Sequence, residues 1–268
     1  MKTEQQIHAL FTRFNSSLTI TSISPLVEGL SNDNYLVKTS TKAFLVKHYR
    51  DHWPAIGLAA QAHFAKQSCC PAPLWLEQAT DTAIFDYVAG SIASGEFCSS
   101  LLPDLVNLHR YPVLTKPMDI AYEINYYRQT ARYQQHASLI EQSLAYIAAA
   151  PKDMGFCHND LVKENIIVNE SGMFLIDFEY AKSNDVYFDL AALVVSFGLN
   201  ESQQLQLLKN YQSRVCEHRE FNLSLEKLAA FHAVFLLLCI CWYEQRGAMD
   251  KVAPLLTQLN HFIEEVKN

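Results

Sequence analysis

The sequence predicts an α+β protein with a small β-rich N-terminal part and a larger helical C-terminal part. In residues 1–90, short β-branched and apolar runs alternate with polar breaks. From residue 91 onward, apolar residues recur mostly at helical spacing. The pattern changes near Val88–Ser91, so we expect two domains, residues 1–90 and residues 91–268.

The N-terminal part is expected to contain one opening helix, several short strands and one inserted helix. Residues 3–15 predict the opening helix because their apolar side chains repeat on one face. The inserted helix is expected at residues 54–67. The strand-like runs are residues 18–23, 34–39, 43–49, 74–76 and 82–87.

The C-terminal part is expected to be helical, except for residues 156–168 and 172–177. These two segments resemble short strands on either side of a polar loop and a turn. The most apolar stretch, residues 229–243, is interrupted by His232. It is shorter than a membrane span requires, so we interpret it as a buried helix.

Composition limits the class of partner. Twenty-one basic and 28 acidic residues give a net charge of −7, which argues against a broad nucleic-acid surface. The seven cysteines include no C-x-x-C pair and therefore indicate neither zinc nor a disulfide framework. The N-terminal sequence lacks the apolar run of a signal peptide. We expect a cytoplasmic protein without membrane insertion; the sequence does not indicate its oligomeric state.

Three polar residues carry the main chemical signal. Asp160 and Asn165 lie five residues apart in the polar loop, and Asp177 ends the next apolar run. Phosphoryl transfer uses one carboxylate to orient the attacking hydroxyl, and a carboxamide with a second carboxylate to bind Mg²⁺. A hairpin with turn-capping polar residues is the alternative. The order and spacing of all three residues favour the chemical interpretation.

These motifs resemble the kinase superfamily, within it the group of aminoglycoside phosphotransferases, choline kinases and thiamine kinases. The segments that carry the resemblance are His158-Asn159-Asp160 through Asn165, Ile176-Asp177-Phe178-Glu179-Tyr180, and residues 184–191. The resemblance covers the chain and implies a bilobal protein-kinase-like fold with ATP and Mg²⁺ as cofactors. It implies a nucleotide-binding lobe at 1–90 and a catalytic, acceptor-binding lobe at 91–268.

The resemblance also assigns roles in the C-terminal lobe. Asp160 becomes the catalytic base, and Asn165 and Asp177 become the Mg²⁺ ligands. Protein kinases differ because they carry a long activation segment, whereas this chain passes from Asp177 to an apparent helix near Asp189. A small-molecule acceptor is therefore expected.

The nucleotide-binding residues follow from a weaker part of the resemblance. Residues 28–35 resemble the phosphate-covering turn of choline kinases, with Gly29, Ser31 and Asn32 as candidate contacts. Lys47 ends a strand-like run where such kinases place the lysine that touches the phosphates. Lys42, which would face the opposite side of the strand, is the competing candidate.

Two further positions complete the expected nucleotide site. Kinases of this kind pair the phosphate lysine with a helix glutamate, but the predicted helix holds Gln61 in that place. Gln61 can hydrogen-bond Lys47 but cannot form an ion pair with it. Asp86 and Tyr87 mark a segment that resembles the hinge, where backbone groups contact the adenine.

The acceptor site is expected to suit a cation. Glu179 follows Asp177 by two residues and adds a carboxylate near the acceptor. Trp242, Tyr243 and Glu244 follow the apolar helix and resemble an aromatic and acidic pocket for an ammonium group. A role of these aromatic residues in the core is the alternative.

The resulting expectation is an ATP- and Mg²⁺-dependent kinase that acts on a hydroxyl of a small cationic metabolite. Choline, ethanolamine and thiamine are the favoured acceptors. The alternatives are a non-catalytic nucleotide- or ligand-binding pseudokinase, which the missing helix glutamate suggests, and an aminoglycoside-type kinase.

Overall fold

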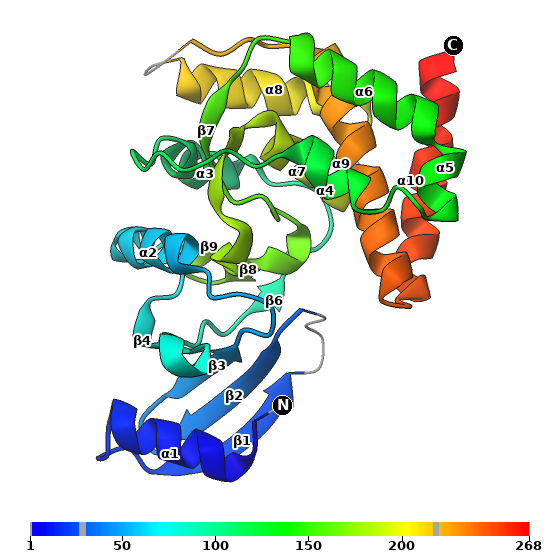
Figure 1. The fold of residues 1–268 in the computed structure, drawn as a ribbon. Helices are drawn as coiled ribbons and strands as arrows, with labels where there is room; N and C mark the ends of the chain where they lie inside the picture. Colours follow the sequence, from blue (N-terminus) through cyan, green and yellow to red (C-terminus); the bar gives the residue numbers. More distant parts are fainter. Residues whose placement is uncertain (1, 27–30, 217–219, 268) are drawn as a thin grey trace. The chain divides into compact units, whose positions relative to one another are not determined.

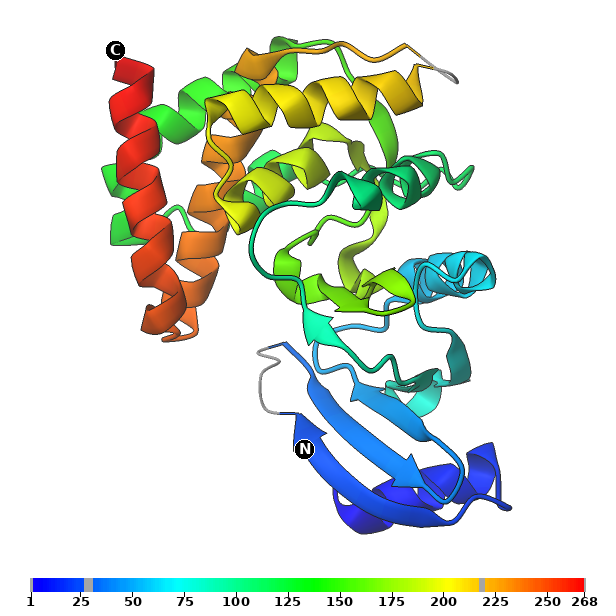
Figure 2. The same cartoon turned by 180° about the vertical axis from the view of Figure 1, so that it is seen from behind.

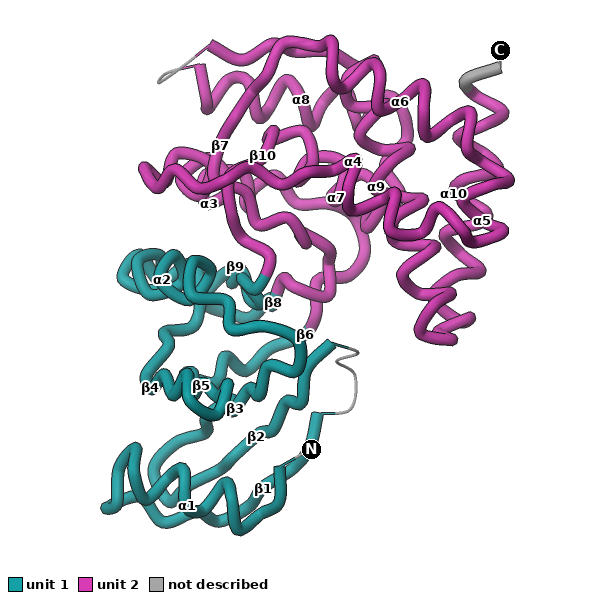
Figure 3. Tube along the Cα trace, viewed as in Figure 1, with its two compact units in different colours: residues 1–91, 167–179 teal, residues 92–166, 180–268 magenta. Residues whose placement is uncertain are grey.

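The chain forms two compact units in a computed structural model that describes residues 2–26, 31–216 and 220–267 (Figure 3). Unit 1 comprises residues 1–91 and 167–179. Unit 2 comprises residues 92–166 and 180–268. A short segment from the second half of the chain therefore belongs with the N-terminal residues.

Unit 1 is built on a five-stranded antiparallel sheet with the strand order β1-β2-β3-β5-β4 (Figure 1). Its strands are β1 (Ile20–Leu26), β2 (Asp33–Thr39), β3 (Ala43–His48), β4 (Pro73–Glu77) and β5 (Thr82–Asp86). Each lies at one of the predicted strand-like runs. The β2–β3 turn is closed by Thr39, whose hydroxyl donates to the carbonyl of Lys42 at 2.8 Å.

Helix α1 (Glu4–Phe14) covers one face of this sheet, as Figures 1 and 2 show from opposite sides. Its N-terminus is fixed by a capping box between Thr3 and Gln6, which satisfies two backbone amides. The apolar side of the helix packs against the strands. The core residues of this layer are Ile7, Leu10, Phe11, Tyr35, Val37, Phe44, Val46 and Ile84.

The opposite face of the sheet packs against α2 (Ala55–Phe64), which continues into the 3₁₀ turn η1 (Ala65–Gln67). Leu58 of α2 joins Ala83 and Phe85 in a second buried cluster, with Leu45 beside them. Because strand side chains alternate, Lys47 shares the face of Leu45. The strand pattern thereby brings a lysine to the α2 side of the sheet.

One 3₁₀ turn and three short strands lie beside the elements already described. They are η2 (Gln78–Thr80), β6 (Ser91–Ile92), β8 (Ile166–Asn169) and β9 (Gly172–Leu175), and the last three strands form a sheet of order β6-β8-β9. The backbone amide of Leu175 donates to the carbonyl of Cys69 at 2.8 Å. This bond ties the end of β9 to the segment after α2.

Unit 2 is mainly helical, with one antiparallel strand pair formed by β7 (Met154–Cys157) and β10 (Lys182–Asp185). The helices are α3 (Leu102–His109), α4 (Ile120–Asn125), α5 (Ala131–Gln135), α6 (Ala137–Ala149), α7 (Tyr187–Phe197), α8 (Glu201–Val215), α9 (Leu225–Gln245) and α10 (Met249–Lys267). The 3₁₀ turns are η3 (Ser99–Leu101), η4 (Lys163–Asn165) and η5 (Phe178–Tyr180).

Helix α9 is the core helix of unit 2, in contact with α6, α7 and α10 (Figure 2). It has 21 residues and is long and apolar enough to cross a membrane by length and composition alone. The argument from length in the sequence was therefore wrong, because the helix extends beyond residues 229–243. Burial supports the core interpretation, since 67% of its most apolar window lies inside the protein.

The N-terminal end of α9 is held by a buried charge network. Lys227 forms ion pairs of 2.7 Å with both Asp153 and Asp185, and all three side chains are at most 5% exposed. Its ammonium also lies 4.4 Å from the ring centroid of Tyr187. Two carboxylates and an aromatic face offset the cost of burying this cation.

His232 provides a test of core packing in α9. Burial lowers the pKa of His232 to about 4, and its ring packs against Phe262 of α10. Between pH 6.5 and 4 the unfolded chain therefore binds a proton that the folded chain does not. We expect the free energy of unfolding to fall by about 3 kcal/mol as the pH is lowered through this window.

The measurement is urea unfolding of the wild-type chain and of His232→Leu at several pH values. The variant should lack this contribution, so the stability difference between the two proteins should change with pH. A difference that stays constant from pH 7 to pH 4 would contradict the prediction.

Candidate active site

The loop of residues 158–165 in unit 2 is closed by Asn165. The Asn165 amide nitrogen donates to the backbone carbonyl of Asp160 at 2.9 Å and to its carboxylate at 2.8 Å. Two of the predicted site residues are thus brought into direct contact. The bonds orient the Asp160 carboxylate and leave the amide oxygen of Asn165 as the atom suited to a cation.

A buried carboxylate at the start of α7 anchors the same loop. Asp189 is fully buried, and its two oxygens accept the backbone amides of His158 and Asn159, each at 2.8 Å. Hydrogen bonds to a charged group are stronger than neutral ones, so this pair fixes the backbone immediately before Asp160. Asp189 therefore has a structural role, as the anchor of the loop that carries Asp160.

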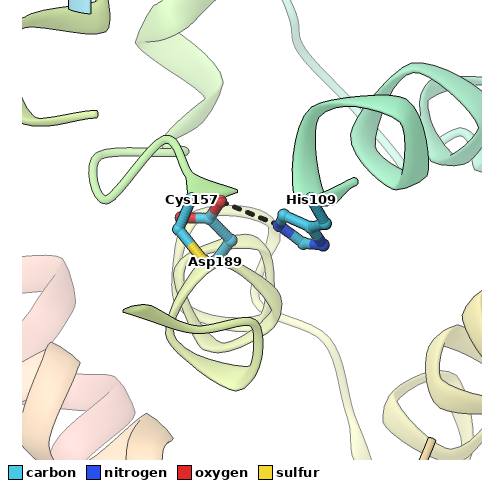
Figure 4. Close-up of side chains that lie close together, drawn as sticks. All are labelled: His109, Cys157 and Asp189. Carbon is cyan, nitrogen blue, oxygen red and sulfur yellow. Dashed lines mark hydrogen bonds and ion pairs between the residues drawn. The ribbon is translucent and has the colours of Figure 1, made fainter. Parts of the chain in front are cut away.

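His109 of α3 completes this anchor (Figure 4). Its Nε2 atom donates to Asp189 at 3.1 Å, because a carboxylate can only accept. Its Nδ1 atom accepts a 2.7 Å hydrogen bond from the Tyr211 hydroxyl. Both ring nitrogens and both carboxylate oxygens are therefore occupied.

Figure 4 also shows Cys157 beside His109 and Asp189, and the three ligand atoms lie within 4.8 Å of one another. Such a group has the composition of a transition-metal site. However, a metal ion would have to displace the hydrogen bond between His109 and Asp189. We interpret the group as a hydrogen-bonded support for the loop.

Asn159 shapes the backbone next to Asp160. It has a φ of +64°, the left-handed region that asparagine adopts more easily than most residues. Its amide nitrogen donates to the carbonyl of Tyr180 at 2.9 Å, and its amide oxygen accepts from Asn184 at 2.8 Å. The loop is therefore tied to the β10 segment as well as to α7.

In unit 1, Lys47 lies among carboxylates. Its ammonium donates to Asp177 and lies 3.4 Å from an oxygen of Glu179. Burial alone would lower the pKa of Lys47, but the two carboxylates outweigh burial and raise it. Lys47 is therefore charged, as an anion-binding site requires.

Gln61 does not contact this cluster through its amide nitrogen. That atom donates to the carbonyl of Pro71 at 2.8 Å, and the Gln61 side chain is buried. The partners of the Lys47 ammonium are instead the carboxylates of Asp177 and Glu179.

The segment before β2 contributes Asn32, whose amide nitrogen donates to Glu179. Asn32 is buried, whereas Ser31 is partly exposed. Gly29, the third predicted residue of this turn, lies outside the described residues. Asn32 thus links this segment to the cluster of charged residues around Lys47.

Close packing of α2 positions the residues after β9. The ring of Phe178 stacks on Phe64 of α2, with centroids 6.5 Å apart. A Cβ atom built on Gly57 would lie 1.8 Å from the carbonyl oxygen of Phe178. Only glycine allows this approach, which holds Asp177 and Glu179 on either side of the buried Phe178.

The remaining predictions in unit 1 concern the surface. Lys42 pairs with Asp86 at 2.6 Å, and both side chains are exposed. Lys42 therefore lies away from the carboxylates that surround Lys47. The ring of Tyr87 is exposed, and the predicted contacts of residues 86 and 87 with adenine stay predictions.

Two side chains of α9, Tyr243 and Cys239, interact electrostatically with the 158–165 loop. Burial raises the pKa of Tyr243, with further contributions from the charges of Glu164 and Asp160. Burial also raises the pKa of Cys239, one turn earlier, and the charges of Asp160 and Glu164 raise it further. Tyr243 and Cys239 thus mark the face of α9 that lies within electrostatic reach of Asp160.

The other two predicted residues of α9 have partners of their own. The Arg246 guanidinium lies 3.8 Å from the ring centroid of Trp242. Glu244 accepts hydrogen bonds of 3.0 and 2.7 Å from Arg132. Both the aromatic face and the carboxylate are therefore already engaged by internal cations.

Sequence reasoning did not identify His109, Tyr211 or Gly57 as supports of the site. His109 and Tyr211 lie 102 residues apart and meet only in the folded chain. Gly57 carried a weak signal, as a glycine inside a predicted helix, where it usually costs stability.

Comparison with known proteins gives a consistent result. A sequence profile described as "Phosphotransferase enzyme family" matches residues 22–221. Protein LicA of Haemophilus influenzae is 32% identical over 88 residues, which are 32% of this chain and only 33% of LicA. Thiamine kinase of Escherichia coli O9:H4 (strain HS) is 24% identical over 230 residues, covering 79% of this chain and 76% of that enzyme.

Solved structures agree on the fold. Choline kinase LicA from Streptococcus pneumoniae superposes with a TM-score of 0.73 at 20% identity, covering 96% of this chain and 100% of that one. LicA in complex with AMP gives 0.74 at 19% identity, covering 97% and 98%. The chain thus has an α+β protein-kinase-like fold, with an N-terminal antiparallel sheet and a helical C-terminal part.

Gly57→Ala tests the packing of α2. Glycine-to-alanine changes inside a helix normally stabilise it by up to about 1 kcal/mol. Here the added Cβ meets the Phe178 carbonyl at 1.8 Å, so we expect a loss of about 1–3 kcal/mol instead. Denaturant unfolding shows directly whether Gly57→Ala raises or lowers the free energy of unfolding. The control is Ala59→Gly on an exposed position of α2, which should cost only about 1 kcal/mol. A Gly57→Ala protein as stable as the wild type would contradict the close approach.

Asp189→Asn tests the anchor of the 158–165 loop. The carboxamide can accept through one oxygen only, so a buried backbone amide loses its partner, at a cost of about 1–3 kcal/mol. We expect faster hydrogen exchange at the amides of His158 and Asn159. Tyr211→Phe is the control, since it leaves both amide bonds intact. Unchanged exchange at the two amides in Asp189→Asn would contradict the assignment.

Proposed function

Because the chain belongs to the phosphotransferase enzyme family, we propose that it transfers the γ-phosphoryl group of ATP to a hydroxyl of a small cationic metabolite. The family match and a thiamine kinase relative support a small-molecule phosphotransferase. Choline, ethanolamine and thiamine are the acceptors we propose. We also propose a cytoplasmic location, where free thiols stay reduced.

The geometry of Asp160 is the observation that carries the proposal. Its carboxylate is held by Asn165 at 2.8 Å, on a loop whose backbone is fixed by the buried Asp189. A positioned carboxylate can accept the proton of an attacking hydroxyl. The hydroxyl oxygen forms a bond to the γ-phosphorus, the bond to the β-phosphate oxygen breaks, and ADP leaves.

Unit 1 supplies the nucleotide-binding residues in this proposal. The charged, buried Lys47 binds phosphate oxygens, and Ser31 and Asn32 contact them from the segment before β2; Gly29, the third predicted contact, lies outside the described residues. Backbone groups at Asp86 and Tyr87 bind the adenine. A LicA structure with AMP supports nucleotide binding in a protein of the same fold.

The residues proposed as metal ligands suit Mg²⁺. Asn165 offers an amide oxygen and Asp177 a carboxylate, the hard oxygen donors that Mg²⁺ prefers. The ion would offset the charge of the phosphates. Asp177 lies two residues after the end of β9 and has a φ of +64°.

The acceptor site is proposed around Tyr243. Its phenol lies within electrostatic reach of Asp160, and its ring makes an edge contact with Trp242 at 5.0 Å between centroids. Trp242 and Glu244 offer an aromatic face and a carboxylate for a cationic group. An acceptor would have to displace Arg246 or Arg132 to use them.

A non-catalytic pseudokinase is the second candidate, because α2 lacks the usual glutamate. Against it stands the set of Asp160, Asn165 and Asp177, since a protein that only binds a nucleotide needs no positioned base. Lys47 already pairs with two carboxylates, Asp177 and Glu179. The absence of a glutamate in α2 is therefore weaker support for a pseudokinase.

An acceptor screen tests the proposal. Purified protein is incubated with labelled ATP, Mg²⁺ and, one at a time, choline, ethanolamine, thiamine and kanamycin. We expect phosphorylation of one of the first three. Asp160→Asn should lower turnover by at least about 100-fold, because it removes the base, and it should leave the thermal stability near that of the wild type.

The matched control is Asp119→Asn, on an exposed position that caps α4. Asparagine is an equally good cap, so turnover should stay at the wild-type level. Near-normal turnover in Asp160→Asn would sink the assignment of the base. Phosphorylation of kanamycin alone would overturn the proposed acceptors, and ATP binding without transfer to any acceptor would favour the pseudokinase.

A further inference from the structure

Glu179 contacts residues proposed to bind the nucleotide, although the sequence had suggested that it faces the acceptor. Its side chain is only 7% exposed, and Lys47, its partner at 3.4 Å, is 5% exposed. The same oxygen, Oε2, also accepts the amide nitrogen of Asn32. Two residues proposed to bind phosphate thus meet at one carboxylate oxygen.

Lys47 needs such a partner to keep its buried ammonium in place before the nucleotide binds and after it leaves. A buried ammonium without a counter-charge costs several kcal/mol. Asp177 provides one in this structure, but the proposed function assigns Asp177 to the metal ion. If the Asp177 carboxylate turns to a cation, Glu179 is the internal acid that still pairs with Lys47.

Helix α2 cannot supply this acid. The amide nitrogen of Gln61 donates to the carbonyl of Pro71, so the end of this side chain is directed toward Pro71. A glutamate at this position would bring its carboxylate against a carbonyl oxygen. The alternative partner of Lys47 therefore comes from the segment after β9, where Gly57 allows Phe178 to pack against α2.

We propose that Glu179 is the positioning residue for Lys47 and Asn32, in place of the helix glutamate that this chain lacks. The inference rests on the proposed function, because it assigns Lys47 and Asn32 to the phosphates. It changes the role expected from the sequence, in which Glu179 faces the acceptor. Glu179 acts through the lysine and the asparagine and touches neither substrate.

The test is a double-mutant cycle on ADP affinity, measured by calorimetry with the full chain and no acceptor. The four proteins are the wild type, Glu179→Gln, Lys47→Met and the double variant. We expect Glu179→Gln to weaken ADP binding about 10- to 100-fold, the range for losing a charged hydrogen bond. Because Glu179 acts through Lys47, the double variant should bind ADP within about threefold of Lys47→Met.

Acceptor kinetics separate the two roles of Glu179. The KM for the acceptor found in the screen should stay within about twofold of the wild type in Glu179→Gln, while the KM for ATP rises. Thermal unfolding adds a readout that needs no ligand. Lys47→Met leaves two unpaired carboxylates together, so adding Glu179→Gln should raise its midpoint.

Glu77→Gln is the matched control, since it removes another paired carboxylate of unit 1, bonded to Arg13 at 2.8 Å. It should not change ADP affinity. Unchanged ADP affinity with a raised acceptor KM in Glu179→Gln would overturn the proposal, as would an equal loss of affinity from Glu179→Gln with and without Lys47. A wild type that binds ADP but phosphorylates nothing overturns the proposed function and leaves this cycle interpretable.

Discussion

The charge of Lys47 is the constraint around which unit 1 is organised. Alternation along β3 turns this lysine away from the α1 layer and toward α2, where it is almost fully buried. Burial of an ammonium requires negative partners, and Asp177 and Glu179 provide them. The segment that carries both acids is far along the chain, and the ion pairs are among the contacts that join residues 167–179 to this unit.

The strands of unit 1 and the 158–165 loop were predictable from the sequence because their signals are local. Alternating apolar residues marked β2 and β3, and the five-residue spacing of Asp160 and Asn165 indicated a closed polar loop. A contact over five residues depends little on the rest of the fold. The bonds from Asn165 to Asp160 show that the spacing has a direct physical meaning.

The partners of the charged and polar residues were not predictable in the same way. Glu179 meets Lys47 from 132 positions away, as their numbers show, and His109 reaches Asp189 across 80 positions. No local pattern reports such a contact. The segment at the end of α9 shows the same limit, because residue type marked Trp242 as a candidate ligand-binding face but did not indicate that the Arg246 guanidinium lies 3.8 Å from its ring centroid.

The left-handed backbone at Asn159 and Asp177 has a consequence for how this protein tolerates change. Both residues have a φ of +64°, and after glycine, asparagine and aspartate accept this conformation at the least cost. Glycine would relieve the backbone at both positions, and at Asn159 the cost would be the side-chain hydrogen bonds to Tyr180 and Asn184. At Asp177, however, glycine would remove the acid that pairs with Lys47. Relief of the backbone at this position would therefore cost the pairing of a buried cation, so stability and chemistry both favour an aspartate there.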